Sequence, residues 1–144
     1  MPDNFETVID TFVIDTEAKI LGVTRGSIFD MIEDVQTPTQ QGGRMRVDTG
    51  FLRISGLASL NSLPAGLGKG RKRAKNEVGV LDEYSGNVGE QVNITLGKME
   101  IGDAFYFGWT ANYAVYREAF DGFLETGLQK WQSYVDENVR KFNK

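Results

Sequence analysis

The sequence predicts one α+β domain: a long N-terminal helix, bent or split, a small antiparallel sheet with a long flexible loop, and a C-terminal amphipathic helix. Apolar residues recur every three or four positions near both ends of the chain, which is the helical period, and shorter alternating stretches lie between them. The length of 144 residues, with 40% hydrophobic and 25% charged residues, is ordinary for a soluble globular chain. Residues 1–144 are therefore expected to form a single domain.

The N-terminal helix is predicted over residues 3–36. Its apolar positions follow the helical period: Phe5, Val8, Ile9, Phe12, Val13, Ile20, Leu21, Ile28, Met31, Ile32 and Val35. Asp3 is a candidate N-cap, with Glu6 as its capping-box partner. Gly22 interrupts the pattern and Thr24 is able to cap a second segment, so one bent helix and two consecutive helices both fit.

The middle of the chain is predicted to contain a first strand and a long loop. Pro38 and a glycine pair end the helix in a turn over residues 37–43. ISGLASLNSL, residues 54–63, alternates apolar with small or polar residues and reads as a strand. Residues 63–90 contain many glycines and few bulky apolar side chains, which predicts a mobile loop, with room for a short strand at 78–81.

Two more strands are predicted after the loop. In QVNITLGKME, residues 91–100, apolar Val92, Ile94 and Leu96 alternate with polar residues. DAFYFGW, residues 103–109, follows a turn around residues 100–102 and reads as the next strand. NYAVYREAF, residues 112–120, fits either a third strand or the lead-in to a helix.

The C-terminal helix is predicted from about residue 121 to 143. Its apolar residues fall on one stripe: Phe120, Phe123, Leu124, Leu128, Trp131, Val135, Val139 and Phe142. Asp121 is the candidate N-cap and Glu125 lies in the first turn, while basic residues concentrate in the C-terminal half.

The composition argues against catalysis. The chain has no cysteine and no histidine, so it lacks thiol nucleophiles, thiolate metal sites and the most common metal ligand. We therefore expect no cofactor, no metal and no enzymatic activity. The N-terminus begins acidic, and no apolar run approaches the roughly 20 residues that span a bilayer. The chain is expected to stay in the cytoplasm or in a particle assembled there.

The triplet Asp48-Thr49-Gly50 is also found in aspartic proteases, where two carboxylates about 3 Å apart share one proton. Such triplets lie between bulky apolar residues, whereas here Arg46 precedes the triplet and Arg53 follows it. We interpret Asp48 as the cap of a short turn, in which Gly50 relieves steric strain in the backbone.

A basic cluster stands out in a chain whose net charge is −4: Lys69, Arg71, Lys72, Arg73 and Lys75. The preceding glycines lack the spacing of a phosphate-binding P-loop. The cluster fits contact with DNA phosphates or with an acidic protein, and equally a solvated loop without a partner.

Two other features have ordinary interpretations. The acidic pairs at 33–34 and 82–83 lack the spacing of a calcium loop. Aromatic residues gather near the last predicted strand: Phe105, Tyr106, Phe107, Trp109, Tyr113 and Tyr116. They could stack nucleic-acid bases, but core packing and a subunit interface are the expected roles.

Two stretches together resemble the signatures of one family. VDTGFLR, residues 47–53, resembles the PVDTGxLR signature of the neck or tail-completion (head–tail joining) proteins of long-tailed bacteriophages and prophages. NYAVYREAF resembles the YAxYxEyG signature of the same family, and the elements follow in the same order. The matching positions are Asp48, Thr49, Gly50, Leu52, Arg53, Tyr113, Ala114, Tyr116 and Glu118.

The resemblance implies a structural virion protein, assembled in the host cytoplasm, that joins the DNA-filled head to the tail. Copies would form a ring homo-oligomer on the head connector and meet the tail terminator or tail tube, with DNA in the lumen. Asp48-Thr49-Gly50 would then be an architectural turn, and Arg53 would pair with an acid of its own or a neighbouring subunit. The basic cluster would face DNA or an acidic neighbour.

Two alternative functions stay open. A tail terminator, which caps the tail tube, is hard to separate from a neck protein by sequence. A nucleic-acid-binding module acting through the basic cluster would bind free DNA with a strong salt dependence.

Overall fold

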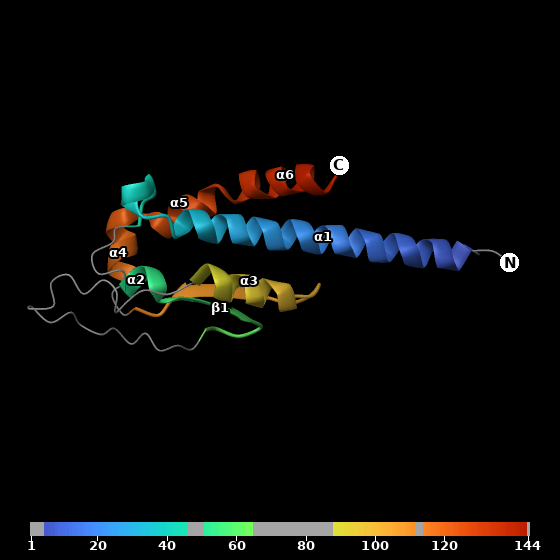
Figure 1. Cartoon of the computed structure of the whole chain (residues 1–144), viewed down its shortest axis with the longest axis horizontal. Helices are drawn as coiled ribbons and strands as arrows, with labels where there is room; N and C mark the ends of the chain where they lie inside the picture. Colours follow the sequence, from blue (N-terminus) through green and yellow to red (C-terminus); the bar gives the residue numbers. More distant parts are fainter. Residues whose placement is uncertain (1–4, 46–50, 65–87, 112–113, 144) are drawn as a thin grey trace, which may run out of the picture.

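The computed structural model has the α+β architecture that the sequence predicts. It describes four stretches of the chain: residues 5–45, 51–64, 88–111 and 114–143. The helix α1 (Phe5–Val35) is the spine of an elongated molecule (Figure 1). The helices α5 (Phe123–Gln129) and α6 (Trp131–Phe142) lie along one side of the C-terminal half of α1, and α3 (Val88–Lys98) and the sheet lie on the other side.

α1 is one continuous helix and is not split at Gly22. The hydroxyl of Thr24 does not cap a second segment; it donates to the Ile20 carbonyl one turn earlier, at 2.8 Å. Asp3, the candidate N-cap, lies outside the described residues.

The two glycines of α1 lie against side chains of α6. A Cβ at Gly22 would lie 2.6 Å from the ring of Phe142, and a Cβ at Gly26 would lie 2.2 Å from Oδ1 of Asn138. Real Cβ atoms do not make contacts this short, so a side chain at either glycine would force Phe142 or Asn138 to move. The sequence signal that suggested a helix break therefore marks a helix–helix contact.

The sheet has two antiparallel strands among the described residues, and both were predicted. β1 (Gly56–Leu60) pairs with β2 (Phe105–Trp109), in a register that runs from Gly56 opposite Trp109 to Leu60 opposite Phe105. The predicted turn at 37–43 contains the short helix η1 (Thr39–Gln41). This helix ends at Gly42, whose φ of 89° favours glycine. The single turn α2 (Phe51–Ile54) leads into β1.

The prediction of a strand at residues 91–100 is wrong, because this segment belongs to α3. Val92 and Leu96 are four residues apart and both are buried, whereas Ile94 between them is exposed. The side chain of Gln91 pairs with the backbone of Ala58 in β1: Nε2 donates to its carbonyl at 2.9 Å and Oε1 accepts from its N–H at 3.0 Å. A side-chain amide on a helix thus takes the place of a third strand. The predicted loop at 63–90 likewise ends earlier, at the start of α3.

The single C-terminal helix that was predicted over about 121–143 is two helices, α5 and α6. The segment that fitted a strand or a helix lead-in forms α4 (Ala114–Asp121), and α5 and α6 meet at Lys130. Asp121 is not the N-cap; it is the last residue of α4, and its carboxylate binds Arg117 at 2.6 Å. The N-cap of α5 is Gly122, whose φ is 64° and which offers no side chain. Gly122 therefore separates α4 from α5, and the continuous helix that the periodicity predicts is interrupted at Lys130, between α5 and α6.

Two buried clusters hold these elements together. One lies between α1, α3 and the sheet: Ile32, Ala58, Val92, Leu96 and Met99. The other lies at the C-terminal end of α1: Val35, Met45, Leu52, Ala111 and Phe123. Trp109 packs against the second cluster and meets the ring of Phe123 edge-on at 4.9 Å. The strand predicted at 78–81 and the turn predicted at Asp48-Thr49-Gly50 lie outside the described residues.

Candidate functional site

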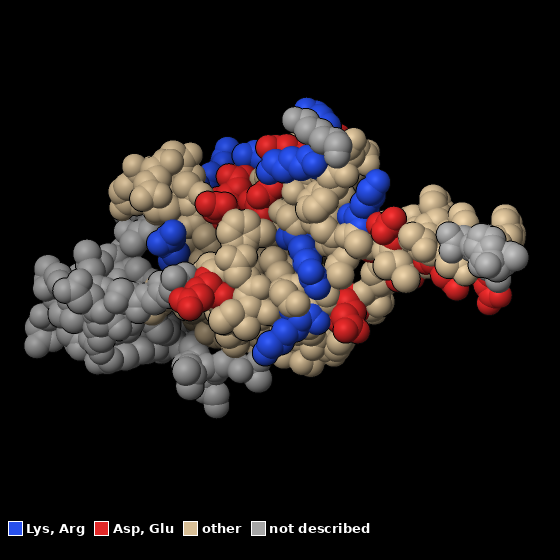
Figure 2. All heavy atoms as spheres, turned by 45° about the vertical axis from the view of Figure 1, so that its right-hand side comes forward, with Lys and Arg blue, Asp and Glu red and all other residues tan. Residues whose placement is uncertain are grey.

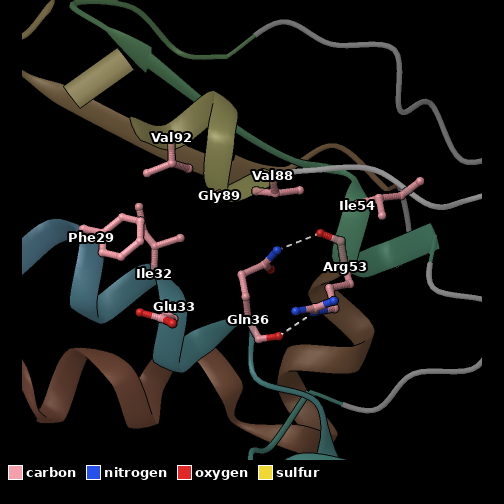
Figure 3. A pocket seen from close by; sticks show the side chains of 9 residues that line it. All are labelled: Phe29, Ile32, Glu33, Gln36, Arg53, Ile54, Val88, Gly89 and Val92. Atoms are coloured by element: carbon pink, nitrogen blue, oxygen red, sulfur yellow. Dashed lines mark hydrogen bonds between the residues drawn. The ribbon is translucent and has the colours of Figure 1, made fainter. Parts of the chain in front are cut away.

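The described part of the first family motif ties α2 to the end of α1. Leu52 is buried in the second cluster. Arg53 and Gln36 exchange two hydrogen bonds: Arg53 Nε donates to the Gln36 carbonyl at 2.8 Å, and Gln36 Nε2 donates to the Arg53 carbonyl at 2.7 Å (Figure 3). Asp48, Thr49 and Gly50 lie outside the described residues, so the turn assigned to them stays a prediction.

Gln36 also joins this contact to the sheet. Its Oε1 accepts a hydrogen bond from Nε1 of Trp109 in β2 at 2.6 Å. The buried amide of Gln36 therefore fixes three elements, and each polar atom of its side chain has a partner. Within the described residues Arg53 Nε binds a carbonyl oxygen; its pairing with an acid of a neighbouring subunit stays a prediction.

The second family motif lies on α4. Ala114 packs against the second buried cluster, and Tyr116 is exposed. Glu118 caps the next helix from one turn away, because its carboxylate accepts hydrogen bonds from the backbone N–H groups of Leu124 at 2.8 Å and Glu125 at 2.9 Å. A carboxylate at a helix N-terminus is favoured by the free N–H groups and the helix dipole. Tyr113 lies outside the described residues.

α4 turns its apolar face outward. Val115, Tyr116 and Phe120 are 79%, 70% and 81% exposed, and at about 100° per residue they share one side of the helix. The charged residues are on the other side: the side chains of Arg117 and Asp121 are 28% and 11% exposed and form an ion pair. An amphipathic helix normally buries its apolar side. We name Val115, Tyr116, Ala119 and Phe120 the α4 face.

The N-terminal half of α1 is a second exposed apolar surface. Residues 5–20, which we name the arm, extend beyond the rest of the molecule (Figures 1 and 2). Phe5 is 78% exposed and Phe12 is 68% exposed. Five more large apolar side chains of the arm are exposed: Val8, Ile9, Val13, Ile14 and Ile20.

The arm continues the side of α1 that α6 covers farther along. One row of residues at three- and four-residue spacing runs the length of the helix: Phe5, Ile9, Phe12, Thr16, Ile20, Val23, Ser27, Asp30 and Asp34. At its C-terminal end this row contacts α6, because Asn138 Nδ2 donates to Asp30 at 2.9 Å and the Tyr134 hydroxyl donates to Asp34. α6 ends at the level of Gly22, and the apolar part of the row is left uncovered.

A small cavity of about 240 Å³ lies between α1, α2 and α3 (Figure 3). Its described lining is mostly apolar: Phe29, Ile32, Ile54, Val88, Gly89 and Val92. The polar lining residues are Glu33, Gln36 and Arg53, of which Gln36 and Arg53 bind each other. The volume is below the roughly 300 Å³ at which ligand pockets begin. The arrangement is that of a packing gap beside a structural contact.

The described residues offer little for metal chemistry or for membrane insertion. Within them, no three His, Cys, Asp or Glu side chains are grouped so that they could hold a metal ion. No helix in the same stretches is long and apolar enough to cross a membrane. The basic cluster Lys69, Arg71, Lys72, Arg73 and Lys75 lies outside the described residues, so its contact with DNA or with a protein stays a prediction.

Sequence reasoning missed three features of this site: the role of Gln36, the capping by Glu118, and the outward direction of the α4 face. The helical period separates the apolar and charged sides of residues 114–121, but only packing decides which side faces outward. No protein-family model matches the chain, and no curated protein and no solved structure matches it. The two motifs and the two exposed surfaces are the features of this chain that bear on its function.

Proposed function

We propose that this chain is a structural virion protein of the phage neck, which joins the DNA-filled head to the tail as a ring on the head connector. The role is assembly: copies contact one another and present surfaces to the connector on one side and to the tail terminator or tail tube on the other. Two short motifs in family order support the proposal. A tail terminator at the end of the tail tube would belong to the same structural class.

The observation that carries the proposal is the α4 face. It belongs to the second motif, and its large apolar side chains are in water in the isolated chain. Contiguous exposed apolar surface, especially with aromatic residues, is typical of protein–protein contacts. An assembly in which the α4 face is covered explains why the helix turns its charged side toward its own chain.

The remaining features are compatible with a scaffold. The carboxylate of Glu118 and the amide of Gln36 are both used in joining helices. In the proposed ring, the basic cluster would face DNA in the lumen or an acidic neighbour.

Electron microscopy of lysates tests the proposal. Cells carrying a phage or prophage that lacks the gene for this chain are induced, and the particles are imaged. We expect DNA-filled heads beside complete, unattached tails, and complementation with the wild-type chain should restore joined particles.

Two complementing variants sharpen the test. Phe120→Ser, on the α4 face, should leave heads and tails unjoined, whereas Gln132→Ser, on an exposed position of α6, should restore joining. Circular dichroism spectra of both purified variants would show that they are folded. Normal infectious particles from the deletion strain would contradict the joining function.

A further inference from the structure

We infer that the arm of one copy packs on the α4 face of the next copy, so that one heterologous contact, repeated, builds the oligomer. This inference rests on the proposed ring function and names the two surfaces that make its subunit contact.

The sizes of the two surfaces fit a shared contact. If aromatic side chains present about 150–250 Å² each, the exposed apolar surface is on the order of 600 Å² for the arm and 400 Å² for the α4 face. Patches of this size on a monomer usually mark interaction sites. Together they approach the roughly 1,200 Å² of total area at which stable protein–protein interfaces begin.

The positions of the two surfaces exclude a contact within one chain. α4 packs near the C-terminal end of α1, through Ala114 and the cluster around Val35, while the arm extends from the opposite end of the molecule (Figure 1). α1 is a continuous helix from Phe5 to Val35 and has no hinge that would let the arm fold back. The arm can therefore meet an α4 face only on another copy. Two different surfaces can pair reciprocally in a two-fold dimer or repeat head-to-tail, and the inferred contact takes the head-to-tail form because only it closes a ring when the rotation per copy permits.

Charge favours this pairing over the pairing of two arms. Three acids lie along one flank of the apolar row of the arm: Glu6, Asp10 and Glu17. An antiparallel pair of arms that matches Phe5 with Ile20 would bring Glu6 of one copy near Glu17 of the other, and like charges at such positions repel.

The α4 face has no such conflict. Its outward residues are uncharged, the acid Asp121 is neutralised by Arg117, and Glu118 is engaged with the N-terminus of α5. The guanidinium of Arg117 lies 5.8 Å from the centre of the Phe120 ring, so the ion pair that borders this aromatic surface adds no net negative charge against an acidic arm.

Cysteine cross-linking tests the contact directly, because the natural sequence contains no cysteine. One preparation of the full chain contains Phe12→Cys and a size tag, and a second, untagged preparation contains Phe120→Cys. A second pair, Val13→Cys with Ala119→Cys, retains both phenylalanines. Disulfide formation is scored on non-reducing gels for the concentrated purified chain and, with the Val13→Cys and Ala119→Cys pair, for joined particles recovered from complemented lysates.

We expect the mixed preparations to form the hetero-dimer, and each single preparation to form at least tenfold less homodimer. A chain that carries both Phe12→Cys and Phe120→Cys should form a ladder of dimers, trimers and higher species. The matched control is Ile14→Cys, which is exposed on the opposite side of the arm and should not cross-link to Phe120→Cys.

Three results would overturn the inference. The first is efficient homodimer formation by Phe12→Cys alone, and the second is a double variant that stops at dimers. The third is a hetero-dimer yield no higher than that of the Ile14→Cys control, both in the purified chain and in the particles. Failure of the joining function gives a different result. A ladder together with normal particles from the deletion strain would retain the contact and remove the neck role. Unjoined heads and tails in the deletion strain, without the expected cross-links, would retain the neck role and remove the contact.

Discussion

Gln36 at the end of α1 and Arg53 in α2 each donate a side-chain hydrogen bond to the backbone carbonyl of the other, at 2.7 and 2.8 Å. Oε1 of Gln36 accepts a hydrogen bond from the indole N–H of Trp109, so one buried glutamine joins α1, α2 and the sheet.

Gln36→Leu should lower the free energy of unfolding by about 2–3 kcal/mol. The change removes the partner of a half-buried indole N–H and of a carbonyl group, and unpaired buried groups cost about 1–3 kcal/mol each. Urea denaturation followed by tryptophan fluorescence measures it. Gln41→Leu, at an exposed position in η1, is the control and should change stability by less than about 0.5 kcal/mol. Equal effects of the two substitutions would show that the Gln36 contacts are not stabilising.

Gly26→Ala and Gly97→Ala should have opposite effects. Replacing a helical glycine with alanine normally stabilises by up to about 1 kcal/mol. A Cβ at Gly97 meets no atom within 4 Å, so this variant should gain that amount. A Cβ at Gly26 would clash with Asn138, so this variant should lose about 1–3 kcal/mol, the usual cost of overpacking.

A double-mutant cycle separates the clash at Gly26 from other causes. Asn138→Ala removes the atom that the new Cβ would meet, although it also removes a hydrogen bond to Asp30. The double variant should therefore be less destabilised than the sum of the two single changes. Strict additivity would argue against close packing of α6 on Gly26.

Glu118→Ala should destabilise the chain by about 1–2 kcal/mol, because two N–H groups at the start of α5 lose a charged acceptor. Glu118→Gln keeps one acceptor oxygen and should have an intermediate effect. Thermal unfolding measures both, with Glu137→Ala, at an exposed position on α6, as the matched control. If Glu118→Gln is as stable as the wild type, the charge of the Glu118 carboxylate contributes nothing to stability.

Tyr134 should ionise at higher pH than a tyrosine in water. Partial burial, together with donation of its hydroxyl to Asp34, raises the pKa of Tyr134 above its ordinary value of 10.0. The neutral form is favoured in the folded chain, so this contribution to stability is complete below about pH 10 and is lost as the pH rises through the folded-state pKa.

An ultraviolet titration of tyrosine ionisation checks the prediction for Tyr134. The difference between wild type and Tyr134→Phe isolates the signal of this residue. Ionisation of Tyr134 at or below about pH 10 would contradict the contact with Asp34.

The sequence predicted the elements whose apolar pattern fits only one period. α1 was found because its period persists over many turns, and the two strands were found where apolar residues alternate between turn residues. α3 was not found, because Val92 and Leu96 fit both a strand and a helix. These two residues pack together against Ala58 and Ile32, and only this tertiary contact favours the helix over the strand.

The sequence by itself determined the α+β class, the long first helix, both strands and the resemblance of two motifs, because each depends on local spacing along the chain. Tertiary structure alone decided that Gly22 marks a helix contact, that the C-terminal helix is interrupted at Lys130, and that the α4 face and the arm are exposed. These properties depend on which surfaces meet, and a helical period shows that a helix has an apolar side without showing what covers it.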